Sequence, residues 1–118
     1  YKLIAFENTR TRKRIKPVDS LDFFSNRSVL AATGLGQPMQ YFEMLKTLGL
    51  QFFSHTVGDH SRLDLDRLQV IYKPEVVVVT AKDAIKLGSC QYDNVWVAII
   101  ECVIPQSLVS AALTVIQE

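Results

Sequence analysis

Cysteine is scarce in this sequence of 118 residues, and the two that occur stand apart from each other. Cys90 and Cys102 form neither a CxxC pair nor a combination with histidine at the spacing of zinc ligands. The sequence therefore predicts no metal site and no disulfide framework. Two separate free thiols are typical of a protein kept in a reducing compartment such as the cytosol.

Long apolar runs and a strong charge of one sign are also lacking. No stretch approaches the roughly 20 apolar residues that cross a bilayer. The formal net charge is only +1, so the composition indicates no nucleic-acid partner. The chain opens at Tyr1, already in strand-like sequence and without methionine, and we therefore expect it to be a piece of a longer protein.

Phosphate-binding loops are missing as well. The GxxxxGK[ST] pattern occurs nowhere, and the turn formed by Gly34 and Gly36 lacks the third glycine of a dinucleotide fingerprint. By itself this turn is a tight connection between a strand and a helix.

What is present, from residue 28 onward, is an alternation of strands and helices. The β-branched run at 76–79 is typical of a central strand that is buried on both faces. Tyr41, Phe42, Leu45 and Leu48 make one apolar helix stripe. Pro38 is suited to the first position of this helix, and Gly49 is suited to end it. We expect strands at 28–32, 50–55, 75–80 and 94–101, and helices after Pro38, at 64–72, at 81–87 and from Pro105 onward.

These alternations predict right-handed crossovers and a mainly parallel sheet with helices on both faces. The fold class is thus α/β, a Rossmann-like three-layer α/β/α sandwich over residues 28–118. Residues 1–27 are expected to form a separate segment, a two-stranded β ribbon that precedes the sandwich.

A dense basic run lies in that first segment, between Arg10 and Pro17. It fits a solvated edge strand, because lysine and proline commonly protect unpaired strands. The functional alternative is contact of Arg12, Lys13 and Arg14 with phosphates on a lipid or a membrane surface.

Parallel strands end at one edge of a sheet, so the loops at 33–38, 57–62 and 80–83 are expected to converge there. Asp59 and His60 bring an acid and a histidine to this edge, although an aspartate before a histidine can also simply cap and orient a loop. Thr80 and Asp83 fit a helix cap, and Lys82 between them has functional potential. Trp96 is expected to pack against a helix.

Three stretches in order resemble the tetraacyldisaccharide 4'-kinase family of the lipid A pathway. Residues 29–38 (VLAATGLGQP), with Tyr41, Phe42 and Leu45 after them, are similar to its AxxGIGxPxxFFxxL stretch. Residues 58–61 (GDHS) resemble its DHH or DHQ motif, and residues 80–87 (TAKDAIKL) resemble its TEKDAVKL. The likeness covers about residues 1–104 and departs from the family at Ala81 and Ser61.

This resemblance implies the carboxyl-terminal domain of a kinase that uses ATP and Mg²⁺, with the ribbon at residues 1–20 belonging to the linker between two domains. Because the chain lacks a phosphate loop, we expect it to bind ATP negligibly and to be inactive on its own. The implied reaction moves the γ-phosphate to the 4'-hydroxyl of a tetraacyldisaccharide 1-phosphate at the cytoplasmic face of the inner membrane. The implied partners are an amino-terminal nucleotide-binding domain, the lipid disaccharide and the membrane surface. His60 and Asp59 would be catalytic, and Gly34, Gly36, Lys82 and Asp83 would contact the substrate or the other domain.

A different class of function fits some of the same residues. A stand-alone Rossmann-like binding or interaction module would retain this fold without catalysis, in line with the absent phosphate loop and with Ala81 and Ser61. An upstream reading frame that contains GxxxxGK[ST] would distinguish the kinase from this module.

Overall fold

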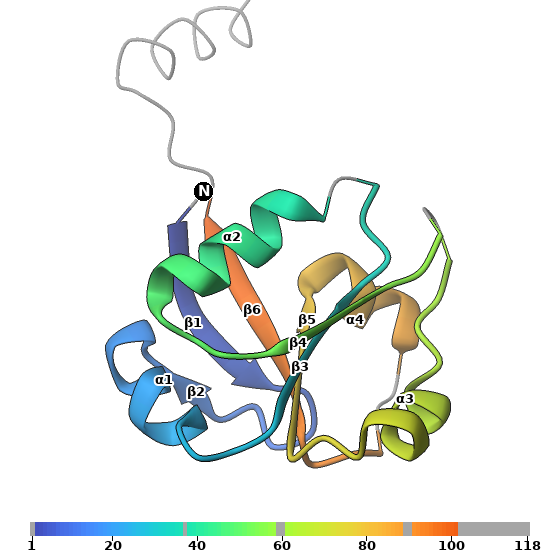
Figure 1. Cartoon of the computed structure of the whole chain (residues 1–118), viewed down its shortest axis with the longest axis horizontal. Helices are drawn as coiled ribbons and strands as arrows, with labels where there is room; N and C mark the ends of the chain where they lie inside the picture. Colours follow the sequence, from blue (N-terminus) through green and yellow to red (C-terminus); the bar gives the residue numbers. More distant parts are fainter. Residues whose placement is uncertain (1, 37, 59–60, 89–90, 102–118) are drawn as a thin grey trace, which may run out of the picture.

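The computed structural model describes residues 2–36, 38–58, 61–88 and 91–101. Within these residues, six strands form one sheet in the order β2-β1-β6-β5-β3-β4, and four helices pack against it (Figure 1). The strands are β1 (Lys2–Asn8), β2 (Arg14–Ile15), β3 (Val29–Thr33), β4 (Phe53–Thr56), β5 (Val76–Thr80) and β6 (Val95–Glu101). The helices are α1 (Pro17–Phe24), α2 (Met39–Leu48), α3 (Leu65–Tyr72) and α4 (Ala81–Leu87).

The sheet has a parallel part and an antiparallel part. β6, β5, β3 and β4 are parallel neighbours, as the alternation of strands and helices predicts. β1 runs antiparallel to both β2 and β6. The predicted ribbon is therefore confirmed, and its pairing of Phe6 with Ala98 makes it the antiparallel edge of the same sheet.

Helices cover both faces, which confirms the three-layer arrangement. One core cluster joins the sheet to α1 and α2 through side chains such as Phe24 and Leu45. The other joins it to α3 through Leu65 and Leu68, with Leu87 of α4 packed against the cluster. All five residues of β3 and all five of β5 are buried, since both strands lie inside the sheet and between two helical layers.

Helix α1 was not expected from the sequence. Pro17, interpreted as the end of the basic run, instead occupies the first turn of the helix, where its missing N–H costs nothing. The buried ring of Phe24 packs edge to face against Phe6, with centroids 5.1 Å apart, and Trp96 lies 5.2 Å from Phe23. These contacts confirm that Trp96 packs against a helix, and they join the first segment to the common core.

Most element boundaries agree with the sequence. Gly49 ends α2 in a left-handed conformation with φ 99°, and Asp64 caps α3 by accepting a hydrogen bond from the N–H of Arg67. Pro38 is the cap residue of α2 and not its first helical residue. The strand expected at 50–55 is shorter and shifted, because Leu50 packs into the core directly after the helix ends. The helix expected from Pro105 lies outside the described residues.

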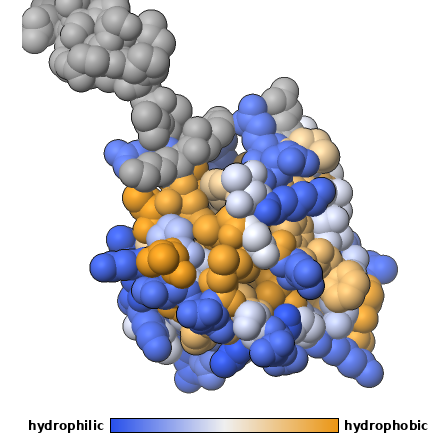
Figure 2. All heavy atoms as spheres, turned by 60° about the vertical axis from the view of Figure 1, so that its left-hand side comes forward, coloured by the Kyte–Doolittle hydropathy of each residue, from blue (hydrophilic) through white to orange (hydrophobic). Residues whose placement is uncertain are grey.

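Part of one face of the sheet remains uncovered by α1 and α2. Near the carboxyl end of β6, Leu3 and Ile100 are only partly buried although they contact the core. Figure 2 brings this side of the molecule forward and shows apolar surface on it. None of the helices formed by the described residues has the length and apolarity that crossing a membrane requires.

The apolar core predicts which side chains carry stability. Leu45 of α2 is fully buried, so Leu45→Ala should lower the free energy of unfolding by about 3 kcal/mol through lost contacts and a residual cavity. Ile85 of α4 is 81% exposed, and Ile85→Ala should change it by less than about 0.5 kcal/mol. Urea denaturation of both variants measures the difference, and equal losses would contradict this description of the core.

Candidate functional site at the carboxyl edge of the sheet

The candidate site lies at the topological switch point of the sheet, where the chain stops adding strands toward one edge and adds them toward the other. The chain passes from β3 through α2 to β4 on one side, and from β5 through α4 to β6 on the other. Because β3 and β5 are neighbours, the loops that follow them diverge and leave a crevice, the place where open α/β sheets bind ligands.

A buried carboxylate joins these two loops. Asp83 is 2% exposed, and its Oδ2 accepts hydrogen bonds from Oγ1 of Thr33 at 2.8 Å and from Oγ1 of Thr80 at 2.6 Å. Its Oδ1 accepts from the backbone N–H of Gly34 at 2.9 Å. The backbone N–H of Thr80 donates to Oδ2 at 3.3 Å, and this bond is half of a capping box. Asp83 thus holds the loop after β3 against the first turn of α4.

The loop after β4 reaches the same place. A Cβ atom on Gly34 would lie 2.7 Å from the carbonyl oxygen of Ser61 and 3.1 Å from Cγ2 of Val57, so only glycine fits. The N–H of Val57 also donates to the carbonyl of Thr33 at 3.1 Å. The predicted convergence of the three loops is confirmed for these residues.

Asp59 and His60 lie outside the described residues. Their neighbours on both sides are described, and the N–H of Ser61 donates to the carbonyl of Gly58 at 2.9 Å. The carbonyl of Ser61 lies against Gly34, so Ser61 itself is at the crevice.

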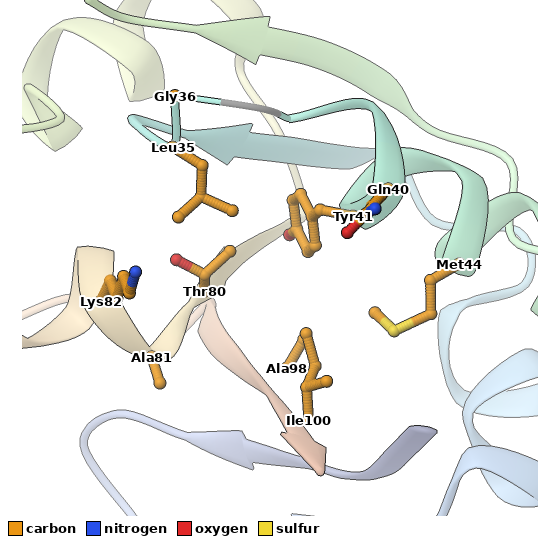
Figure 3. Close-up of a pocket in the computed structure, with 10 residues that line it drawn as sticks. All are labelled: Leu35, Gly36, Gln40, Tyr41, Met44, Thr80, Ala81, Lys82, Ala98 and Ile100. Carbon is orange, nitrogen blue, oxygen red and sulfur yellow. The ribbon is translucent and has the colours of Figure 1, made fainter. Parts of the chain in front are cut away.

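Two hollows flank Lys82. The larger one, which we call the α2–β6 hollow, has a volume of about 390 Å³ and is shown in Figure 3. Leu35, Met44 and Ile100 extend into it, and Thr80, Ala81 and Lys82 border it on the α4 side. A second hollow of about 300 Å³ is lined by Gly34, Leu35, Gly36, Lys82, Asp83, Ile85 and Lys86. The exposed Lys82 and Gly36 line both hollows and are available to a ligand, whereas Gly34 and Asp83 are buried.

Tyr41 lines the α2–β6 hollow, a role that its place in the apolar stripe did not reveal. Its hydroxyl donates to the carbonyl of Val78 at 2.9 Å. Burial raises the pKa of Tyr41 well above its ordinary value of 10, and the negative charge of Asp83 adds to this effect. Tyr41 therefore stays neutral and forms a wall of the hollow.

The basic run lies elsewhere. Asn8, two residues before its first arginine, pairs with Trp96 at the amino end of β6, whereas the crevice lies at the carboxyl ends of the strands. Nε of Arg14 lies 2.9 Å and an Nη of Arg12 3.4 Å from the carboxylate of Glu7. The hydrogen bond from Arg14 is the main reason why the pKa of Glu7 is lowered. Arg12, Lys13 and Arg14 thus belong to a second surface.

The described residues of the crevice lack two features that commonly bind a nucleotide and its metal ion, a free carboxylate and a phosphate loop. Both oxygens of Asp83 already accept protein hydrogen bonds, and the turn from Gly34 to Gly36 has no phosphate-loop lysine after it. In the described part of the chain, no group of three His, Cys, Asp or Glu side chains is placed to hold a metal ion.

Fold and crevice together define a doubly wound α/β domain with a buried carboxylate at its switch point. Comparison with known proteins narrows this class. The chain matches the family model for tetraacyldisaccharide-1-P 4'-kinase over residues 3–117, and it belongs to that family.

Relatives with the name tetraacyldisaccharide 4'-kinase agree with this assignment. That of Shewanella oneidensis is 30% identical over 83 residues, which cover 70% of this chain and 25% of the relative. That of Aeromonas hydrophila is 33% identical over 84 residues, with the same coverage. A third, from Shewanella sp. strain W3-18-1, is 30% identical over 96 residues, 77% of this chain and 28% of the relative. The chain spans about a quarter of the length of these relatives, and no solved structure matches it significantly.

The hydrogen bonds of Asp83 lead to a stability prediction. Asp83→Ala would leave the hydroxyl of Thr33 and the N–H of Gly34 buried without this acceptor, which should cost about 3 kcal/mol of unfolding free energy. Lys82→Ala, one residue away on the same helix but exposed, should cost less than about 0.5 kcal/mol. Urea denaturation decides the matter, and an Asp83→Ala variant as stable as Lys82→Ala would refute the role given to the carboxylate.

Proposed function

We propose that this chain is the carboxyl-terminal domain of a tetraacyldisaccharide 4'-kinase. The whole enzyme would transfer the γ-phosphate of ATP to the 4'-hydroxyl of a tetraacyldisaccharide 1-phosphate. The observation that carries the proposal is the family match over residues 3–117, together with the meeting of the family-like stretches around Gly34, Ser61 and Asp83 in one crevice.

The nucleotide would be bound outside this chain. A phosphate loop occurs nowhere in its sequence, and the relatives are about four times as long as the segment they share with it. We assign ATP and Mg²⁺ to an amino-terminal domain. This domain would close over the crevice and supply its contacts from the other side, because phosphoryl transfer depends chiefly on positioning and on charge stabilisation.

Within this division, His60 and Asp59 would act on the substrate hydroxyl. A histidine near neutrality can orient a carboxylate that accepts the hydroxyl proton, and Asp59 would position the imidazole or its loop. Gly34 and Asp83 would position that loop, because Gly34 leaves room for Ser61 and Asp83 fixes Gly34. Gly36 and Lys82 are exposed and would contact the substrate or the closing domain.

The basic run would act separately from the crevice. Arg12, Lys13 and Arg14 are exposed on the antiparallel edge of the sheet, and with Glu7 they retain a net charge of +2, three positive charges and one negative. We propose that this charge holds the protein peripherally at the anionic cytoplasmic face of the inner membrane, where its lipid substrate would lie.

A histidine variant tests the catalytic assignment. In the intact enzyme, His60→Ala should lower the turnover number by roughly 10²-fold or more, the usual scale of acid–base assistance, and leave the melting temperature nearly unchanged. Single-turnover rates and thermal melts of the same preparation measure the two quantities.

His55 provides the matched control, because it is the other histidine of the chain and lies on the edge strand β4. Its Nδ1 is 3.0 Å from the hydroxyl of Tyr72, so His55→Ala should affect stability and leave the turnover of the folded enzyme unchanged. An unchanged turnover number in His60→Ala would end the catalytic assignment.

The intact gene distinguishes the kinase from the alternative function. If its reading frame upstream of Tyr1 encodes no phosphate-loop domain, a non-catalytic module would be favoured.

A charge reversal tests the membrane contact. Lys13→Glu leaves the pairs of Glu7 with Arg12 and Arg14 in place and should weaken binding to anionic vesicles at least about fivefold, at roughly 1 kcal/mol per charge near the surface. Lys46→Glu makes the same charge change on α2 and should have little effect. Co-sedimentation at low and moderate salt compares them, and equal binding by both variants would rule out a specific contact.

A further inference from the structure

The α2–β6 hollow is an apolar surface on a sheet that is otherwise well covered. It lies over the carboxyl ends of β5 and β6, between α2 and the first turn of α4 (Figure 3). Ala98 at its floor is buried, but Ile100 and Met44 at its sides are only partly buried. An apolar concavity of this size on one face of an α/β sheet is a place where a further apolar element packs.

The two helices on this face cover the sheet only in part. Rings from α1 pack on Trp96, near the start of β6, with Phe23 at 5.2 Å and Phe24 at 6.1 Å. Tyr41 and Met44 of α2 approach the same strand from the side of β3 and β5. Toward the end of β6 the cover is incomplete, and Leu3, paired there with Ile100, is only partly buried.

The remaining sequence has the pattern of a helix that is largely buried. When residues 105–117 are placed at 100° per residue, the apolar side chains fall within an arc of about 200°. They are Leu108, Val109, Ala111, Ala112, Leu113, Val115 and Ile116. The polar side chains occupy the opposite arc and are Gln106, Ser107, Ser110, Thr114 and Gln117. An apolar arc this wide needs a large apolar partner.

We propose that the chain's own residues 105–117 form a helix that packs into the α2–β6 hollow and covers the end of β6. The distance is short, since Ile100 lines the hollow and residues 102–104 reach up to about 10 Å. A 13-residue helix is about 20 Å long and has the length of a regular crossover helix. The proposal does not depend on the proposed function.

Charge argues against a membrane as the occupant. Residues 102–117 contain no lysine, arginine, aspartate or glutamate. Helices that lie in a membrane interface typically carry basic residues on their polar face, and a span needs about 20 apolar residues. An uncharged polar arc suits a helix whose other side is buried against its own domain.

Methyl NMR of the 118-residue chain, labelled with ¹³C only in the methionine methyl groups, tests the proposal. The sequence has two methionines, of which Met44 lines the hollow and Met39 is 61% exposed and outside it. We expect nuclear Overhauser contacts from the Met44 methyl to the side chains of Leu108, Ala112 or Val115. Leu108→Asp should shift the Met44 signal and leave that of Met39 in place.

Ser110→Asp is the matched control, because it adds the same charge two residues away in the middle of the polar arc. It should shift neither signal. The contacts in the unmodified chain keep the test valid if Leu108→Asp fails to fold. Absence of these contacts, or contacts only between differently labelled copies in a mixed sample, would overturn the proposal. A Met44 signal that responds to anionic vesicles and not to Leu108→Asp would overturn it in favour of a membrane.

Discussion

The hydrogen bonds accepted by the buried carboxylate of Asp83 hold the carboxyl edge of this sheet together. Burying a carboxylate away from water costs several kcal/mol unless donors replace the lost hydration. Here the donors are two hydroxyls and two backbone N–H groups, from Thr33, Gly34 and Thr80. Since these donors come from both loops at the switch point, the geometry of the crevice and the stability of the domain depend on the same side chain. The position of the loop after β4 depends on the same hydrogen bonds, because Asp83 fixes Gly34 and Ser61 packs on Gly34. A Cβ atom at Gly34 would fill the space that Ser61 occupies.

The surrounding strands make this arrangement possible. β3 and β5 are buried along their whole length, and the four residues of β5 that precede Thr80, Val76 to Val79, are all valines. Electrostatic interactions are stronger in such a medium than in water, and the cost of leaving a polar group unpaired is higher too. A low-dielectric sheet interior therefore favours one arrangement of the two loops over alternatives in which any donor is lost. Ser61, which packs on Gly34, would gain its position from this preference.

Local chemistry let the sequence predict much of this fold. The valine run of β5, the glycine end of α2 and the capping pair of Thr80 and Asp83 are confirmed because each depends on neighbouring residues. Helix α1 was not predicted because Pro17 was interpreted as the end of the basic run that precedes the helix, and because only Ser20 and Phe24 of its eight residues are buried. Pairings between distant residues could not be predicted either. Thr33 and Asp83 are 50 positions apart, and the wall formed by Tyr41 and Val78 depends on the packing of α2.

The position of the basic run limits how the domain could meet a membrane. The crevice and the basic run lie at opposite ends of β6, which has seven residues and is about 20 Å long at roughly 3.3 Å per residue. If the sheet stood upright on the basic end, the crevice would lie far above the headgroups that carry the proposed substrate's reacting hydroxyl. Both ends reach one membrane plane only when the strands lie nearly parallel to it. The edge formed by β1 and β2, where Arg12 and Arg14 flank Glu7, is at the side of the sheet and would then face the lipid. In the proposed kinase, the antiparallel edge would thus set the orientation of the crevice as well as the attraction to the surface.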